Sequence, residues 1–133
     1  RQPAPRAQAR DIARRGAGDL SAKRSLLARL NDIRDAIERI RRYTAGKDLA
    51  TYGKDEFLRD AVERCVEIIS EASRQVPAES KQKHPEIPWQ DIAGIGNILR
   101  HEYSRIEDRV IWNVVTRHLE PLSRAIAALL RDP

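Results

Sequence analysis

The helical spacing of its large apolar residues is the feature that most restricts how this 133-residue chain can fold. Between residues 21 and 43 the apolar positions step by four, three, four and three, which places them along one side of a helix: Leu26, Leu30, Ile33, Ile37 and Ile40. No segment shows the sustained alternation of apolar and polar residues that a half-buried strand requires. The sequence therefore predicts an all-α protein.

Three further segments carry the same helical pattern, and we predict helices over residues 55–76, 88–103 and 106–130. Pro121 lies inside the last of them and removes one backbone hydrogen bond, so we expect a kink or a restart of the C-terminal helix there. Four main helices joined by short connections favour an up-and-down bundle.

Positive charge is concentrated at the N-terminus. Residues 1–24 hold seven basic and two acidic residues, which accounts for the whole net charge of +5. Residues 1–20 also contain two prolines and two glycines, so we interpret them as a basic extension, disordered or weakly helical, that precedes a helical domain over residues 21–133. Two interpretations of the extension stay open: a leader or alternative start without function, and an arm that binds phosphates nonspecifically.

Several classes of protein are excluded by composition. No apolar run approaches the roughly 20 residues that span a membrane, and the N-terminus lacks the apolar core of a secretory signal. The single cysteine, Cys65, lies in an apolar helical stripe, so we expect an inert buried thiol in a reducing cytoplasm. The three histidines are 17 residues apart, which is no metal-ligand spacing, and we expect no metal or other cofactor.

The segment over residues 88–103 carries the candidate chemistry. Pro88 suits the first turn of a helix, where a missing N–H is harmless. Gly94 and Gly96 lie in mid-helix, where each costs about 1 kcal/mol relative to alanine, so close approach of another backbone is one reason for keeping them. The segment ends in side chains that can act as acids, bases or anion ligands: Arg100, His101, Glu102 and Tyr103.

These residues resemble the active-site segment of the HEPN ribonuclease toxins of the HepT type, which are paired with a minimal nucleotidyltransferase antitoxin. The family motif is an arginine, four residues, a histidine, any residue and a tyrosine. His101 and Tyr103 match it, and the arginine position falls on Gly96. The resemblance covers residues 25–131 and includes several shorter segments: residues 32–33, 36–40, 43–46, 60–64, 67–72 and 84–89.

The resemblance implies the helical HEPN bundle and a metal-independent endoribonuclease acting on RNA, with tRNA as the favoured substrate. In such a reaction the RNA 2′-hydroxyl attacks the adjacent phosphate, which requires a base near neutral pH and a cation against the developing charge. Histidine suits the first task and a guanidinium the second. We therefore assign acid/base catalysis to His101 and positioning of the substrate to Tyr103.

Gly96 leaves the source of the cation open. Arg100 lies one helical turn further on and could place its guanidinium where the motif arginine would project, while Asn97 could orient the His101 ring. Alternatively the site is disabled, and an arginine at position 96 would restore it. The competing function is then a catalytically silent helical module that binds a partner protein or a nucleotide.

The resemblance also implies a cytoplasmic toxin–antitoxin system. The partner nucleotidyltransferase would transfer AMP from ATP to Tyr103 and so block the site by charge and bulk. We expect a homodimer for two reasons. Each chain supplies a single histidine, His101, for acid/base catalysis, and in HEPN toxins the motifs of two chains lie on opposite sides of one cleft. Gly94 and Gly96 would permit close approach of helices at that interface.

Overall fold

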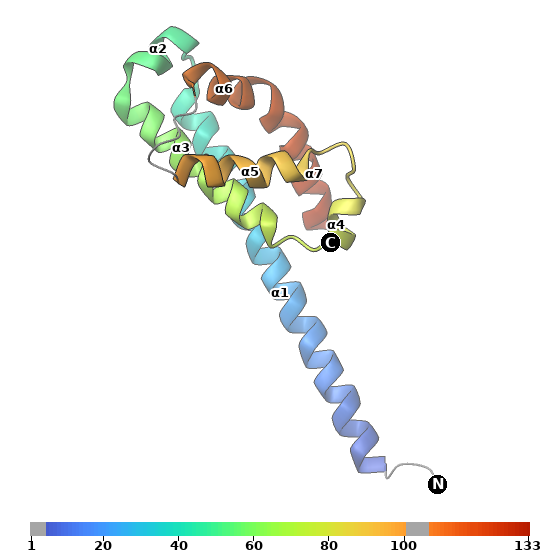
Figure 1. The fold of residues 1–133 in the computed structure, drawn as a ribbon. Coiled ribbons are helices and arrows are strands. Elements are labelled where there is room, and N and C mark those ends of the chain that lie inside the picture. The colour runs from blue at the N-terminus through green and yellow to red at the C-terminus, as the bar shows by residue number, and fades with distance from the viewer. Residues whose placement is uncertain (1–4, 101–106) are drawn as a thin grey trace.

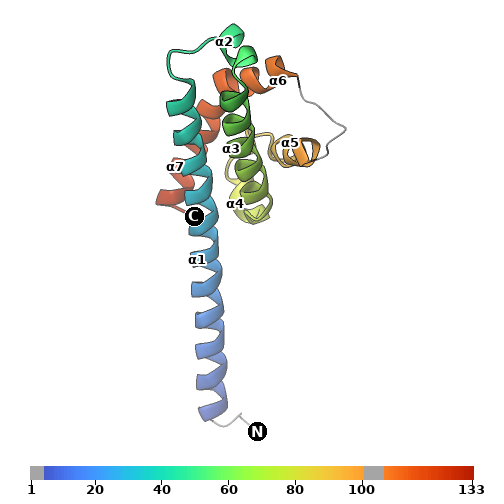
Figure 2. The ribbon, with the colours of Figure 1, turned by 90° about the vertical axis from the view of Figure 1, so that its left-hand side faces the viewer.

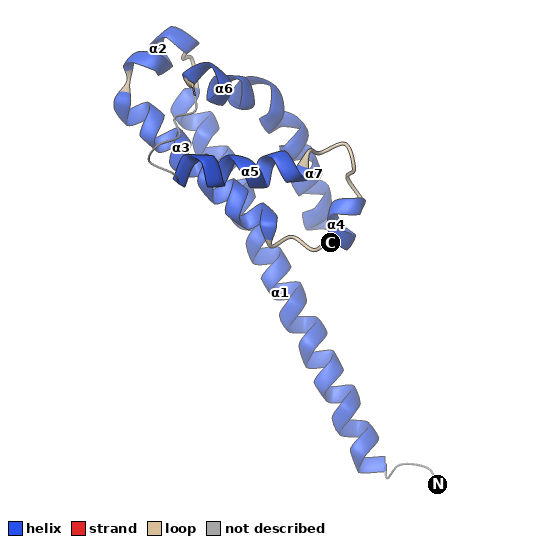
Figure 3. Ribbon diagram, in the orientation of Figure 1, coloured by secondary structure: helices blue, strands red, loops and turns tan. Residues whose placement is uncertain are grey.

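The structure of this chain, a computed structural model, describes residues 5–100 and 107–133. Every regular element in these two ranges is helical, as Figure 3 shows, so the all-α class is confirmed. The long helical runs are α1 (Pro5–Thr44), α3 (Glu56–Arg74), α5 (Trp89–Arg100) and a joined C-terminal run of α6 (Asp108–Asn113), a π-helical turn (Val114–His118) and α7 (Leu119–Arg131). Two short helices lie in the connections: α2 (Leu49–Lys54) and α4 (Ala78–Gln82).

Helix α1 is longer than the apolar pattern predicts. The pattern places its start near Ser21, whereas the helix begins at Pro5 and includes most of the basic extension. Its first half projects away from the other helices as a free arm (Figures 1 and 2), because the residues before Leu26 offer almost no apolar side chains to bury. Two residues past the end of α1, Gly46 adopts a φ of +70°, the left-handed conformation that commonly ends a helix.

The core lies where α3 is enclosed by its neighbours. Helix α1 packs against α3 and α7, and α5 packs on another side of α3, crossing it steeply (Figures 1 and 2). Burial of a large aliphatic side chain contributes about 1.5–3 kcal/mol, so the apolar seams hold the bundle together. Fully or almost fully buried members are Leu30, Ile33, Ile37 and Ile40 of α1, Val62, Cys65 and Ile69 of α3, and Leu122, Ile126 and Leu129 of α7.

The C-terminal run continues through the position of Pro121 without a break. A π-helical turn over Val114–His118 directly precedes α7. This turn contains Arg117. In a regular α-helix its carbonyl would clash with the ring of Pro121, which has no N–H to donate to it. The expected irregularity therefore occurs one turn before the proline, as a wider turn in a joined helix.

Two sequence predictions concern the burial of Cys65 and the absence of a membrane-spanning segment. Cys65 is a free thiol with no exposed surface, and burial raises the pKa of its thiol, which keeps it protonated at neutral pH. Within residues 5–100 and 107–133, no helix has both the length and the apolar character needed to cross a bilayer.

Candidate active site on helix α5

The start of α5 is held by the loop that precedes it. Trp89 is nearly buried, and its indole Nε1 donates a hydrogen bond of 3.0 Å to the carbonyl of His84. The Pro88 carbonyl accepts a hydrogen bond of 3.1 Å from the Ile92 backbone N–H, so the helix begins directly after Pro88. The His84 ring itself contacts Glu86 within this loop, 3.1 Å away, and takes a structural part in it.

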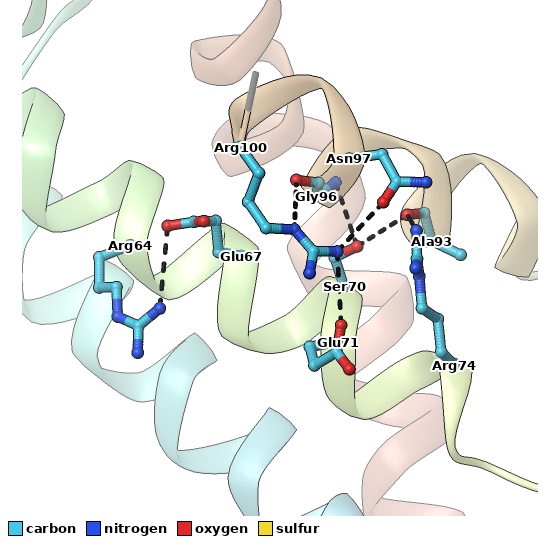
Figure 4. A network of polar contacts seen from close by, with 9 residues as sticks. All are labelled: Arg64, Glu67, Ser70, Glu71, Arg74, Ala93, Gly96, Asn97 and Arg100. Carbon is cyan, nitrogen blue, oxygen red and sulfur yellow. Dashed lines mark hydrogen bonds and ion pairs between the residues drawn. The ribbon is translucent and has the colours of Figure 1, made fainter. Parts of the chain in front are cut away.

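Gly96 is the point of closest approach between α5 and α3. Its backbone N–H donates to the Ser70 hydroxyl at 3.1 Å, and that hydroxyl donates to the Ala93 carbonyl at 2.9 Å (Figure 4). A Cβ atom on Gly96 would lie 2.6 Å from the Ser70 Cβ and still closer to its hydroxyl. The structure therefore shows a close approach of this glycine within the chain, to α3.

Gly94 has different surroundings. A Cβ atom placed on it would meet no atom of the described residues within 4 Å. Ile98, one turn further on the same side of α5, keeps 44% of its surface exposed. On this outer face of α5 the described residues thus leave an apolar side chain exposed.

Arg100 lies beside Gly96 and is held by three acceptors (Figure 4). Its Nε donates to the Gly96 carbonyl at 3.3 Å, and its Nη2 donates to the Asn97 side-chain oxygen at 3.1 Å. The same Nη2 is 3.4 Å from a carboxylate oxygen of Glu71 and 3.9 Å from the place that a Cβ on Gly96 would occupy. The structure thus brings Gly96, Asn97 and Arg100 together, with Asn97 bonded to the guanidinium.

His101, Glu102 and Tyr103 lie outside the described residues. Their assigned roles remain predictions, and so does the proposed orientation of the His101 ring by Asn97.

Sequence reasoning missed three residues of α3 that border this site. Ser70 is fully buried, Glu71 pairs with Arg100, and Arg74 donates from its Nη2 to the Ala93 carbonyl at 2.8 Å. The available signal was Ser70 itself, one of two serines, with Ser73, among the mostly apolar buried residues of α3.

A groove of about 700 Å³ lies next to the first turns of α5. Cationic, acidic, amide and apolar side chains line it together. Its walls include Arg74, Lys81, Gln82, Pro85, Trp89 and Asp91. Among the described residues, no group of three or more His, Cys, Asp or Glu side chains is arranged to hold a metal ion.

Comparison with known proteins identifies the family. Residues 33–129 match the family described as Ribonuclease HepT-like. The chain belongs to the HepT-like ribonuclease family. The resemblance seen in the sequence is confirmed, and the motif segment of α5 falls inside the matched range.

Individual relatives agree with this membership. The chain is 38% identical over 100 residues to a protein of Thermococcus cleftensis named "Probable ribonuclease HepT", covering 75% of this chain and 91% of that one. It is 32% identical over 102 residues to the "Putative RNase TTE0752" of Caldanaerobacter subterraneus, covering 77% and 88% of the two chains.

A third relative is considerably longer. The chain is 34% identical over 103 residues to a Methanocaldococcus jannaschii protein named "Gamma-glutamylcyclotransferase and putative RNase MJ0434", covering 77% of this chain and 46% of that one. The matched part thus spans about half of that relative. No solved structure matches the chain at a comparable level of significance.

Proposed function

We propose that this protein is a metal-independent endoribonuclease and the toxin of a toxin–antitoxin pair, with tRNA as its favoured substrate. The observation that carries the proposal is the guanidinium of Arg100, which lies on the last turn of α5 beside the motif position, directly before His101 and Tyr103. Membership of the HepT-like ribonuclease family supports the reaction class.

The proposed reaction needs only RNA and protein side chains. His101 removes the proton of the 2′-hydroxyl, whose oxygen forms a bond to the adjacent phosphorus while the bond to the 5′-oxygen breaks. The leaving oxygen takes up a proton, and Tyr103 positions the phosphate. Arg74 and Lys81 in the adjoining groove would bind the backbone of the same strand, because phosphate contacts from cationic side chains supply most of the affinity for nucleic acid.

A homodimer would bring two copies of this site together. Gly94 and Ile98 on the outer face of α5 support this arrangement, since this face has open space and an exposed apolar side chain. The antitoxin would be a nucleotidyltransferase that attaches AMP to Tyr103, adding negative charge and bulk at the position where RNA phosphate binds.

The second candidate is a catalytically silent module that binds a protein or nucleotide. The absence of an arginine at position 96 favours it, together with the lack of room for one there.

RNA cleavage by the purified chain separates these two functions. We expect cleavage of total RNA or tRNA that persists in EDTA and is lost in His101→Ala, with His84→Ala as the matched histidine control. Loss of cleavage in EDTA would contradict the metal-free mechanism. Equal activity of the wild type and His101→Ala would favour the silent module and assign any cleavage to a contaminant.

A further inference from the structure

Position 96 has no room for a side chain, because Ser70 of α3 fills the space beside it. Ser70 has no exposed surface, and its hydroxyl bonds to both the Gly96 N–H and the Ala93 carbonyl. Both hydroxyl contacts are to backbone atoms of α5, so Ser70 cannot swing away without losing them. An arginine at position 96 would displace this serine and separate the two helices.

The guanidinium is nevertheless present at this place. Arg100 is one helical turn from Gly96, and long side chains on a helix lean back toward the preceding turn. Its Nη2 lies 3.9 Å from the site of the missing Cβ, and its Nε is bonded to the carbonyl of Gly96 itself. Ser70 fills the space of a side chain at 96, and the Arg100 guanidinium lies directly beside that space.

We propose that Ser70, Gly96 and Arg100 form one unit that moves the motif arginine by one helical turn, and that Arg100 is the phosphate-binding catalytic residue of this chain. The inference rests on the proposed function and explains how a site without the motif arginine keeps its cation. Asn97 and the Gly96 carbonyl are then positioning groups that hold the guanidinium in one orientation.

The contacts of Arg100 leave it able to take a phosphate. Nε and one N–H of Nη2 are committed to α5, whereas the bond to Glu71 is an exposed ion pair, of a kind that contributes little to stability. Among the described residues Nη1 has no hydrogen-bond partner. A phosphate that displaces the Glu71 carboxylate can therefore bind the Nη1–Nη2 edge with two parallel hydrogen bonds.

A relocation experiment tests this inference. Arg100→Gln should lower the rate of RNA cleavage by about 10²- to 10³-fold, the usual effect of removing one group that stabilises developing charge. Arg64→Gln is the matched control, because Arg64 is an exposed arginine on α3 that pairs with Glu67 in the same region (Figure 4), and its rate should stay close to wild type. Gly96→Arg alone should lower the unfolding temperature and should not raise the rate.

The deciding variant returns the arginine to position 96 and makes room for it. The triple variant Ser70→Gly, Gly96→Arg, Arg100→Gln should be more active than Arg100→Gln. The double variant Ser70→Gly, Arg100→Gln should not be. Wild-type activity in Arg100→Gln, with His101→Ala inactive, would overturn this inference and leave the proposed function standing. A wild-type chain without His101-dependent cleavage would contradict the proposed function instead.

Binding gives a readout that does not depend on turnover. A 2′-O-methyl RNA oligonucleotide cannot react, and its affinity should fall in Arg100→Gln and not in Arg64→Gln. Equal affinity in both variants would overturn the assignment of Arg100 to the phosphate.

Discussion

At the scale of single residues, the two glycines of α5 have opposite surroundings. Gly96 is pressed against Ser70, whereas Gly94 borders open space. Glycine in mid-helix is unfavourable by itself, so only tertiary contact can make one of them necessary and leave the other replaceable.

The Gly96→Ala variant should therefore lose about 1–3 kcal/mol of unfolding free energy through overpacking against Ser70. The Gly94→Ala variant, its matched control, should be neutral or gain up to about 1 kcal/mol. Urea denaturation of both variants measures the two effects. Similar stability changes at the two positions would show that Ser70 does not restrict position 96.

Tyr103 should be the residue that receives AMP. Incubation with the partner nucleotidyltransferase and ATP should add one or more AMP units to the mass of the chain, and Tyr103→Phe should remove them. The other tyrosines provide internal controls: Tyr52 has no exposed surface, and Tyr43 is half-buried with its hydroxyl bonded to Arg39. Peptide mapping of the modification to Tyr43 or Tyr52 would refute the assignment.

At the scale of helices and loops, the groove is built by the end of α3, the short helix α4 and the start of α5. Arg74 of α3 and Lys81 of α4 both line it, so elements separated along the chain supply its two cationic side chains. The groove adjoins the seam that holds Arg100, since Arg74 bonds to Ala93 and Glu71, one turn before Arg74, bonds to Arg100.

Lys81→Gln should weaken RNA binding and reduce the slope of log K against log salt by about one, the loss of a single phosphate contact. The maximal rate should change little, because Lys81 belongs to α4 and lines the groove with the first turns of α5, whereas Arg100 is at its last turn. Lys47→Gln, an exposed lysine in the loop after α1, is the control for loss of charge. Salt titrations of binding measure both, and an unchanged slope in Lys81→Gln would exclude the groove from the RNA path.

At the scale of the whole molecule, α1 covers one side of α3 and itself packs against α7, while α5 covers another side of α3. Among the described residues, the outer face of α5 keeps Ile98 exposed. If His101 is the catalytic histidine, as proposed, an exposed apolar side chain on the neighbouring face of α5 suits a composite site between two copies.

The chain should therefore be a homodimer in solution. Light scattering coupled to size exclusion should give twice the chain mass of 15.2 kDa at tens of micromolar protein. Ile98→Glu should shift the mass toward the monomer, because it places a charge on the outer face of α5, while Val110→Glu, at an equally exposed apolar residue of α6, serves as the control. A monomeric wild type would contradict the composite site.

Helix positions were predictable from the sequence because periodicity reports directly which side of a helix is buried. The steps from Leu26 to Ile40 predicted the buried seam of α1, and the second predicted helix agrees with α3 within two residues at each end. The start of α1 was not predictable in this way, since residues 5–20 carry no periodic signal, and residues 9–10 and 12–20 are exposed.

For the site, the sequence by itself determined the residue types: a histidine and a tyrosine at motif spacing, a glycine at the arginine position and an arginine one turn later. It left open whether that glycine disables the site. Only the tertiary structure decided why position 96 holds no side chain and where the Arg100 guanidinium lies, because both depend on Ser70, a residue 26 positions away along the chain. Contacts between helices arise from packing, and no local pattern in either helix specifies them.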